Sequence, residues 1–269
     1  MRHPVRAFAP IHTTDSPGFV STGLLSLDRT LRGGFPLGAA SLAAGRPRVG
    51  VTSLLIGTAL NALKQGRRVA YFSERLREDQ IRGRFVVLES RVNGYRFRAG
   101  MVTQEDRDAL TAGRERIAWN ELSLIAKPQV TVSEIAEHLF SYRPELVLLD
   151  IAPKPLGDHD PHRFAILMEG VEEICEVAQH HRVAAVLRHV LPKADHAPNR
   201  LELPGVGAMA DKFATVVLVH REEVTNPVSA PDDSVGLAEL HVVRVGSRDV
   251  GPRVVPVRFD QRFAGLLDL

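Results

Sequence analysis

The sequence predicts an α/β fold in which a mostly parallel central sheet is flanked by helices and finishes with antiparallel C-terminal strands. From Ala39 onward, short apolar runs alternate with longer segments of helical periodicity, the pattern of parallel strands joined by crossover helices. The last three apolar runs have no helical segment between them, and strands connected in that way pair antiparallel. A glycine-containing turn between the first strand and the first helix is typical of a phosphate-binding loop.

The individual elements follow from these periodicities. The apolar runs predict strands at residues 39–43, 68–73, 122–126, 146–150, 183–187, 215–220, 240–245 and 254–259. The amphipathic segments predict helices at residues 52–65, 78–91, 104–118, 132–141 and 161–180.

Capping residues support several of the predicted helix boundaries. Thr103 with Asp106 and Thr131 with Glu134 have the spacing of capping boxes, in which the two side chains satisfy each other's backbone N–H groups. Residues 160–161 are Asp-Pro, an N-cap followed by a proline in the first helical position.

Two regions of unequal length are expected. Residues 1–20 are predicted to form an extended arm, because Pro4, Pro10 and Pro17 disfavour a continuous helix. Residues 21–269 are predicted to form one large domain, since a chain of 269 residues can bury a sizeable core.

Composition excludes several classes of protein. The 34 Lys and Arg residues against 32 Asp and Glu residues give a formal net charge of +2, so any binding of nucleic acid must depend on local patches. The single cysteine, Cys175, excludes a disulfide framework, and its apolar neighbours predict a buried thiol. No segment approaches the ~20 apolar residues that span a bilayer, so we expect a cytoplasmic protein with no membrane partner.

The turn after the first strand fits the phosphate-loop pattern G-x-x-x-x-G-K-[ST] at every fixed position except the lysine. The candidate nucleotide-binding residues are Gly45, Arg46, Pro47, Arg48, Val49, Gly50, Val51, Thr52 and Ser53. Backbone N–H groups would still wrap phosphates, and Thr52 would still hold Mg²⁺, but Val51 removes the cation. A charge-assisted hydrogen bond contributes about 1.5–3 kcal/mol, so nucleotide affinity is expected to fall roughly tenfold or more.

Two other interpretations of this turn stay open. It can be a plain connection from strand to helix in a protein that binds no nucleotide. Alternatively, Arg46 or Arg48 supplies replacement charge, although neither side chain begins where the lysine would.

The segments before and after the turn carry a family resemblance. Residues 21–29 read Ser-Thr-Gly-Leu-Leu-Ser-Leu-Asp-Arg and residues 33–38 read Gly-Gly-Phe-Pro-Leu-Gly. Together they resemble the entry to the motor domain of bacterial replicative DNA helicases of the DnaB type, and more loosely RecA, RadA and KaiC-like ATPases. Further segments follow the helicase pattern in order: residues 69–73, 80–81, 89–92, 97–100, 103–110, 147–150 and 215–221.

The resemblance implies a RecA-like P-loop fold from about Ser21 to the C-terminus. It implies ATP and Mg²⁺ as cofactors, with Asp150 in the place of the Walker B aspartate and Thr52 as the second metal-coordinating residue. It also implies DNA and a replication or recombination protein as partners.

Several catalytic positions of the family are altered. The position of the catalytic glutamate holds Arg75, with Glu74 one place early on the opposite face of a strand end. The Ser-Gln sensor falls near His189, and in the segment of the arginine finger only Arg244 or Arg248 is able to imitate that group. Because loss of one catalytic group often lowers a rate by ~10²–10⁴, hydrolysis of ATP is expected to be lost.

Two loops correspond by position to the DNA-facing loops of the family. They span residues 152–162 and 192–202, and their candidate phosphate contacts are Lys154, Lys193 and Arg200. Charged side chains in loops are also common on surfaces that bind nothing.

The leading hypothesis is a non-motor DNA-binding or regulatory module of DNA replication or recombination. One alternative is a weak ATP-dependent helicase that uses Arg46 or Arg48 in place of the lysine and Glu74 in place of the glutamate. Another is a protein-binding adaptor with no role for nucleotide or DNA. A monomer or small oligomer is expected in preference to a stable hexamer, because the short arm lacks a linker helix and the altered nucleotide site weakens subunit cohesion.

Overall fold

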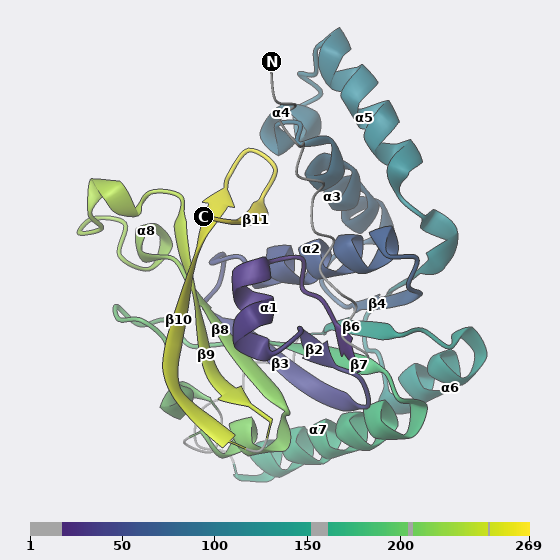
Figure 1. Cartoon of the computed structure of the whole chain (residues 1–269), viewed down its shortest axis with the longest axis vertical. Helices are drawn as coiled ribbons and strands as arrows, with labels where there is room; N and C mark the ends of the chain where they lie inside the picture. The colour runs from purple at the N-terminus through teal and green to yellow at the C-terminus, as the bar shows by residue number, and fades with distance from the viewer. Residues whose placement is uncertain (1–17, 152–160, 204–206, 247) are drawn as a thin grey trace, which may run out of the picture.

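The computed structural model describes residues 18–151, 161–203, 207–246 and 248–269, and a nine-stranded sheet runs through them (Figure 1). In sheet order the strands are β11 (Gly265–Asp268), β10 (Arg248–Asp260), β9 (Leu237–Val245), β8 (Thr215–His220), β3 (Ala39–Gly45), β7 (Ala184–Val190), β6 (Leu146–Asp150), β4 (Val69–Ser73) and β5 (Leu122–Ala126). The strands from β8 to β5 are parallel, whereas β9, β10 and β11 are antiparallel. The predicted fold class is confirmed.

Helices cover both faces of the sheet (Figure 1). The first face packs against α1 (Leu25–Leu31), α2 (Val51–Lys64) and α3 (Glu78–Ser90). The second face packs against α6 (Val132–Tyr142) and α7 (Pro161–His181). Because side chains alternate along a strand, neighbouring residues serve different cores: Tyr71 lies in the first and Phe72 in the second.

All of the predicted strands and helices are present, several of them with shifted ends. The strand predicted to stop at residue 187 continues to Val190, and the strand predicted from residue 254 begins at Arg248. Both helices with predicted capping boxes, α5 (Gln104–Arg116) and α6, have them, at Thr103 and Thr131. Residue 160 of the predicted Asp-Pro cap lies outside the described residues.

Short elements were not predicted. They are β1 (Phe19–Val20), β2 (Phe35–Pro36), β11, α1, α4 (Gly94–Arg98) and α8 (Glu222–Thr225). A strand of two residues has no periodicity to detect, and β1 exists only because it pairs with β2. The predicted arm therefore ends in a paired strand at Phe19–Val20, while residues 1–17 lie outside the described part of the chain.

Pairing of β1 with β2 requires a glycine. Gly34 has φ +117°, and a Cβ atom there would lie 2.2 Å from the carbonyl oxygen of Val20. Any other residue would be strained in backbone and would also displace β1.

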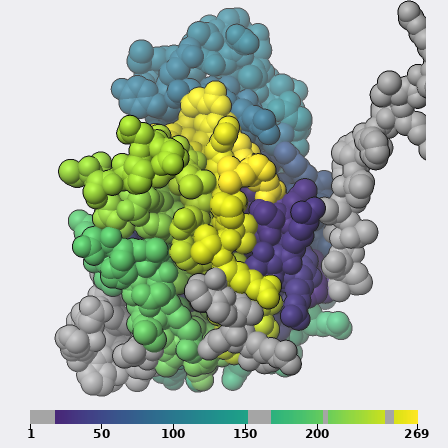
Figure 2. Space-filling model, turned by 60° about the vertical axis from the view of Figure 1, so that its left-hand side comes forward, coloured from purple at the N-terminus to yellow at the C-terminus, as the bar shows by residue number. Residues whose placement is uncertain are grey.

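The C-terminal strand caps α1, the first of the described helices. Leu24, in the N-cap position of α1, makes no side-chain cap. Instead Asp268 of β11 accepts hydrogen bonds from the N–H groups of Leu25 (2.7 Å) and Ser26 (3.0 Å). The C-terminal segment (yellow) accordingly lies against the N-terminal segment (purple) in Figure 2. A carboxylate at a helix N-terminus satisfies free donors and interacts favourably with the helix dipole.

We predict that Asp268→Ala destabilises the fold by about 0.5–2 kcal/mol, the usual cost of losing an N-cap. Urea unfolding followed by circular dichroism measures the change. Asp233→Ala, at an exposed carboxylate outside α1, is the control and should change stability by less than about 0.5 kcal/mol. Equal effects of the two substitutions would show that the cap does not contribute.

Candidate functional site

The phosphate-loop segment joins β3 to α2, as its sequence pattern predicts. β3 ends at Gly45 and α2 begins at Val51, with Gly50 in the N-cap position at φ +116°. The first N–H groups of a helix have no partner within it, and the helix dipole favours an anion at that end. The backbone of this turn is therefore suited to hold phosphate oxygens.

Val51 contributes packing at the position where the pattern has lysine. Its side chain is buried in the core on the α2 face. A Cβ atom added to Gly45 would lie 2.9 Å from Cγ2 of Val51 and 2.8 Å from Cγ2 of Val49. Apolar side chains therefore close against the start of the loop, and they bring no charge to it.

The two arginines of the loop have different surroundings. Arg46 is buried and donates through Nη2 to Oε2 of Glu202 over 2.8 Å, which ties the loop to the segment before residue 203. Its Nε and Nη1 atoms have no hydrogen-bond partner among the described residues. Arg48 is exposed and has φ +71°.

Asp150 is the centre of a buried polar cluster. The residue is 1% exposed, and its Oδ2 atom accepts from the hydroxyl groups of Tyr71 (3.1 Å) and Thr52 (3.4 Å). Burial and the neighbouring Asp150 carboxylate raise the pKa of Tyr71 well above its usual value, so the phenol stays protonated and donates.

Arg188 completes this cluster, and the sequence did not reveal it. Its Nε atom lies 3.4 Å from Oδ1 of Asp150, and its side chain is 6% exposed. Burial lowers the pKa of Arg188, and Asp150 opposes that shift. The sequence prediction ended the strand at residue 187. A signal was available, because Ala184, Val186 and Arg188 alternate onto one face.

The cluster is a poor fit to a divalent cation. The structure does bring together Thr52 and Asp150, the two residues that the resemblance implies for Mg²⁺. Arg188, however, already neutralises Asp150. A +2 ion about 4 Å from a guanidinium would be repelled by several kcal/mol at an effective dielectric constant of ~20. The residues present do not fit Mg²⁺ at Asp150 while Arg188 keeps this position.

The residues at the position of the catalytic glutamate have other roles. Glu74 accepts the backbone N–H of Val130 over 2.8 Å, so its carboxylate holds the turn after β5. Arg75 is exposed, and Oγ of Ser73 accepts its backbone N–H over 3.3 Å. The positive charge of Arg75 also acts to lower the pKa of Arg188.

The candidate finger and DNA contacts are only partly accessible. Arg244 donates through Nε to the carbonyl oxygen of Phe213 (2.8 Å) and through Nη1 to Asp211 (3.1 Å). The same Asp211 carboxylate accepts from Arg200 over 2.7 Å. Lys193 is exposed in the loop after β7.

Two further candidates are not placed. Lys154 lies outside the described residues. Arg248 begins β10, and its side chain is not among those described.

Cys175 and the histidines offer no reactive or metal-binding group in the described part of the chain. Cys175 is half-buried, which corrects the prediction of a buried thiol, since only one side of α7 packs on the sheet. Burial still raises the pKa of its thiol to about 11, which disfavours the nucleophilic thiolate. Burial and Arg188 lower the pKa of His189 to about 4, so it is neutral at pH 7. Among the described residues, no three His, Cys, Asp or Glu side chains are grouped to hold a metal.

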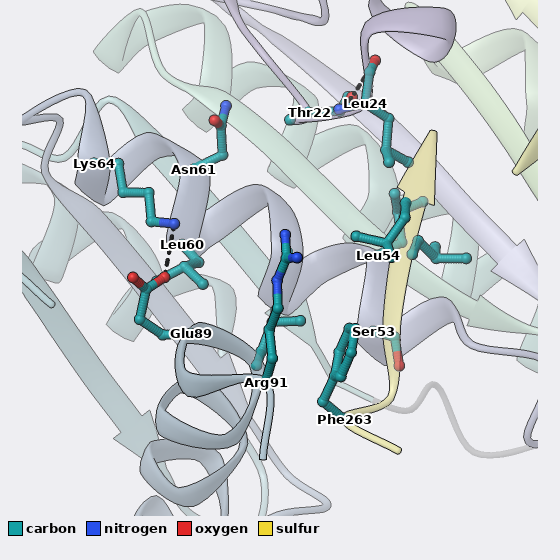
Figure 3. Close-up of a pocket in the computed structure, with 15 residues that line it drawn as sticks. Thr22, Leu24, Ser53, Leu54, Leu60, Asn61, Lys64, Glu89, Arg91 and Phe263 are labelled. Atoms are coloured by element: carbon teal, nitrogen blue, oxygen red, sulfur yellow. Dashed lines mark hydrogen bonds and ion pairs between the residues drawn. The ribbon is translucent and has the colours of Figure 1, made fainter. Parts of the chain in front are cut away.

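A separate hollow of about 180 Å³ lies between α2, α3, β11 and the segment before α1 (Figure 3). Lys64 reaches across part of it to Glu89 over 2.7 Å, and Arg116 binds the same carboxylate over 2.8 Å. Glu89 thus binds two of the cations around the hollow, and Arg91 lines it as a further cation. None of the described helices combines the length and apolarity needed to cross a membrane.

Known proteins resemble this chain in sequence. Residues 19–152 match the family described as DnaB-like helicase C terminal domain. The replicative DNA helicase DnaB of Rickettsia bellii is 30% identical over 129 residues, and that of Synechocystis is 37% identical over 152 residues. These alignments cover 43% and 54% of this chain but 25% and 17% of the helicases, so the chain matches a minor part of their length.

Solved structures share the fold at low sequence identity. One solved ATPase domain has a TM-score of 0.81 with this chain at 17% identity, covering 94% of this chain and 93% of that one. A DnaB-like replicative helicase has a TM-score of 0.78 at 16% identity, over 93% of this chain and 62% of that one. At these identities the likeness establishes the fold alone. The resemblance to the DnaB-type motor domain and the RecA-like fold expected from the sequence are both confirmed.

We predict that Arg46 and Glu202 are energetically coupled, because both side chains are largely buried and Arg46 has no other charge partner among the described residues. In a double-mutant cycle with alanine, the coupling free energy is expected to reach about 1–3 kcal/mol. The exposed pair Arg77 and Asp79, at 2.8 Å, is the matched control, with a coupling below about 0.5 kcal/mol. Urea unfolding of the four proteins of each cycle gives both values. Additive effects at Arg46 and Glu202 would contradict a structural ion pair.

Proposed function

We propose that this chain is a non-motor relative of the DnaB-type helicase domain, a binding or regulatory module of DNA replication or recombination that does not hydrolyse ATP. One observation carries the proposal. The two chemically decisive positions of the nucleotide site carry no catalytic group: Val51 is buried against Gly45, and the exposed Arg75 stands in place of the glutamate. The neighbouring carboxylate of Glu74 is already bound to the N–H group of Val130.

The magnitudes favour loss of catalysis over a slow motor. The lysine would stabilise charge on the transferring phosphoryl group, and the glutamate would polarise the attacking water. Removal of one such group lowers a rate by ~10²–10⁴. Here both are changed, and the arginine that would serve a neighbouring subunit, Arg244, is bound to Asp211.

DNA is the proposed partner, and one exposed cation, Lys193, supports it. Lys193 is exposed in a loop that begins at the end of β7, and Arg200 lies further along the same loop. The relatives named above are replicative DNA helicases, which motivates DNA as the ligand. A cytoplasmic location and a monomeric or small oligomeric state belong to the same proposal.

A weak ATPase is the second candidate. It is favoured by the 3.4 Å contact between Thr52 and Asp150, since these two side chains would share a metal ion in an active site. The ion pair of Asp150 with Arg188 argues against it.

We predict that the purified protein hydrolyses ATP at the background rate, below about 0.1 per second, whereas typical enzymes turn over at about 1–10³ per second. Phosphate release measured with and without Mg²⁺ tests this. Val51→Lys should strengthen nucleotide binding about tenfold, the value of one charge-assisted hydrogen bond, without starting hydrolysis. Mg²⁺-dependent turnover that disappears in Asp150→Asn would make the weak-ATPase alternative correct.

We predict salt-dependent binding of a fluorescent single-stranded oligonucleotide, measured by anisotropy. Lys193→Ala should weaken binding and reduce the slope of log K against log salt by about 0.7, the value for one phosphate contact on a single strand. Lys64→Ala is the control, because Lys64 is paired with Glu89 on α3. An affinity independent of salt, or unchanged in Lys193→Ala, would favour the adaptor without a DNA role. Light scattering in the same buffers gives the oligomeric state.

A further inference from the structure

Arg188 is a buried cation whose hydrogen-bonding capacity is not used. The side chain is 6% exposed, and neither Nε nor Nη1 has a hydrogen-bond partner among the described residues. Its one charge partner among them, Asp150, lies 3.4 Å away, beyond a short charge-assisted bond, and Oδ1 of Asp150 also lacks a hydrogen bond. Buried charges in proteins normally form several short bonds, so this pair has capacity for a further charged group.

The register of the sheet places Arg188 on the face of the phosphate loop. Leu146 and Leu148 of β6 and Ala184 and Val186 of β7 contribute to the core under α2. Because side chains alternate, Asp150 and Arg188 continue those two rows on the same face. Thr52, in the first turn of α2, contacts the same carboxylate. Arg188 thus faces the N-terminus of α2, although it comes from a different strand.

Two cations besides Arg188 belong to this end of the sheet, Arg75 after β4 and Arg46 in the loop. Arg75 is close enough to influence Arg188, and Arg46 of the loop is buried with two unpaired guanidinium nitrogens. Against them stand Asp150, shared with Arg188, and Glu202, which binds Arg46. A divalent cation would add to an already positive site, whereas a polyanion would balance it.

We propose that Arg188 supplies the cation that the phosphate loop lacks, so that the loop and Arg188 bind a polyphosphate anion, such as that of a nucleoside diphosphate, without Mg²⁺. The backbone N–H groups at the start of α2 hold the phosphate oxygens, and Arg188 takes the role of both the lysine and the metal ion. This inference assigns a ligand to the phosphate loop on which the proposed function also depends. It requires that the loop binds the anion, and it does not require that ATP hydrolysis is absent.

Asp150 then lowers the affinity for the phosphate ligand, whereas in a metal site it would raise that affinity. Where a carboxylate holds Mg²⁺, its removal weakens binding of the nucleotide. Here the carboxylate competes with the phosphates for Arg188 and repels them. Its neutralisation therefore strengthens binding of the anion.

Isothermal titration calorimetry of the full chain with ADP and with pyrophosphate tests the proposal, in EDTA and in Mg²⁺. Both ligands should bind in EDTA, with a Kd within about threefold of the value for the same protein in Mg²⁺. Tighter binding of ADP than of pyrophosphate identifies a nucleotide as the source of the anion, and equal affinity identifies a free polyphosphate. Absence of binding, or binding only with Mg²⁺, overturns the proposal.

Variants assign the effect to Arg188. Arg188→Ala should raise the Kd for ADP at least tenfold, the equivalent of one charge-assisted hydrogen bond, and Arg188→Lys should recover most of the loss. Asp150→Asn, which preserves the shape of the side chain, should lower the Kd at least threefold. An unchanged Kd in Arg188→Lys and Arg188→Ala, or weaker binding in Asp150→Asn, contradicts the proposal.

Folding of the variants is measured alongside binding. Arg188→Ala leaves Asp150 buried without its partner, so urea unfolding should confirm that each variant folds. If Arg188→Ala fails to fold, the tighter binding expected of Asp150→Asn still decides, because a destabilised protein does not gain affinity. ATP turnover is measured separately, so failure of this inference is distinct from failure of the proposed function.

Discussion

Parallel pairing of β3, β6 and β7 is the constraint on which the candidate site depends. The register places Ala43 beside Arg188 and Gly45 beside Val190, while Leu149 pairs with Leu187. Parallel strands end at the same edge of a sheet, so the phosphate loop, Asp150 and Arg188 meet although they are far apart in the chain. A shift of one residue in β6 or β7 would turn the side chain of Asp150 or Arg188 to the opposite face of the sheet, which α7 covers.

The charge distribution at this edge differs from that of a phosphate loop with its lysine. Val51 joins the apolar core, and the buried positive charge comes instead from Arg188 on β7 and Arg46 in the loop. Each arginine is paired with a carboxylate, Asp150 or Glu202, which reduces the cost of burying it. The loop therefore keeps its backbone while the side chains around it have changed their electrostatic role.

The antiparallel strands connect this edge to the rest of the fold. Phe259 of β10 lies against the loop, because a Cβ atom at Gly50 would be 3.1 Å from its ring. The guanidinium of Arg221, just after β8, stacks 3.8 Å above the same ring. Asp268 of β11 then caps α1. The C-terminal strands thus hold both the loop and the segment that enters the domain.

The sequence by itself determined the α/β class, the parallel strands with their crossover helices, and the loop with Val51 in the lysine position. Periodicity and capping residues are local signals. Each capping box, at Thr103 and at Thr131, lies within four consecutive residues. The sequence did not predict the short elements: β1 and β2, for example, exist only because they pair with each other. Tertiary structure alone decided which arginine faces the loop. Arg46 is bound to Glu202, whereas Arg188, 137 positions beyond Val51, faces Asp150. Strand register sets that arrangement, and no local pattern encodes register between strands so distant in sequence.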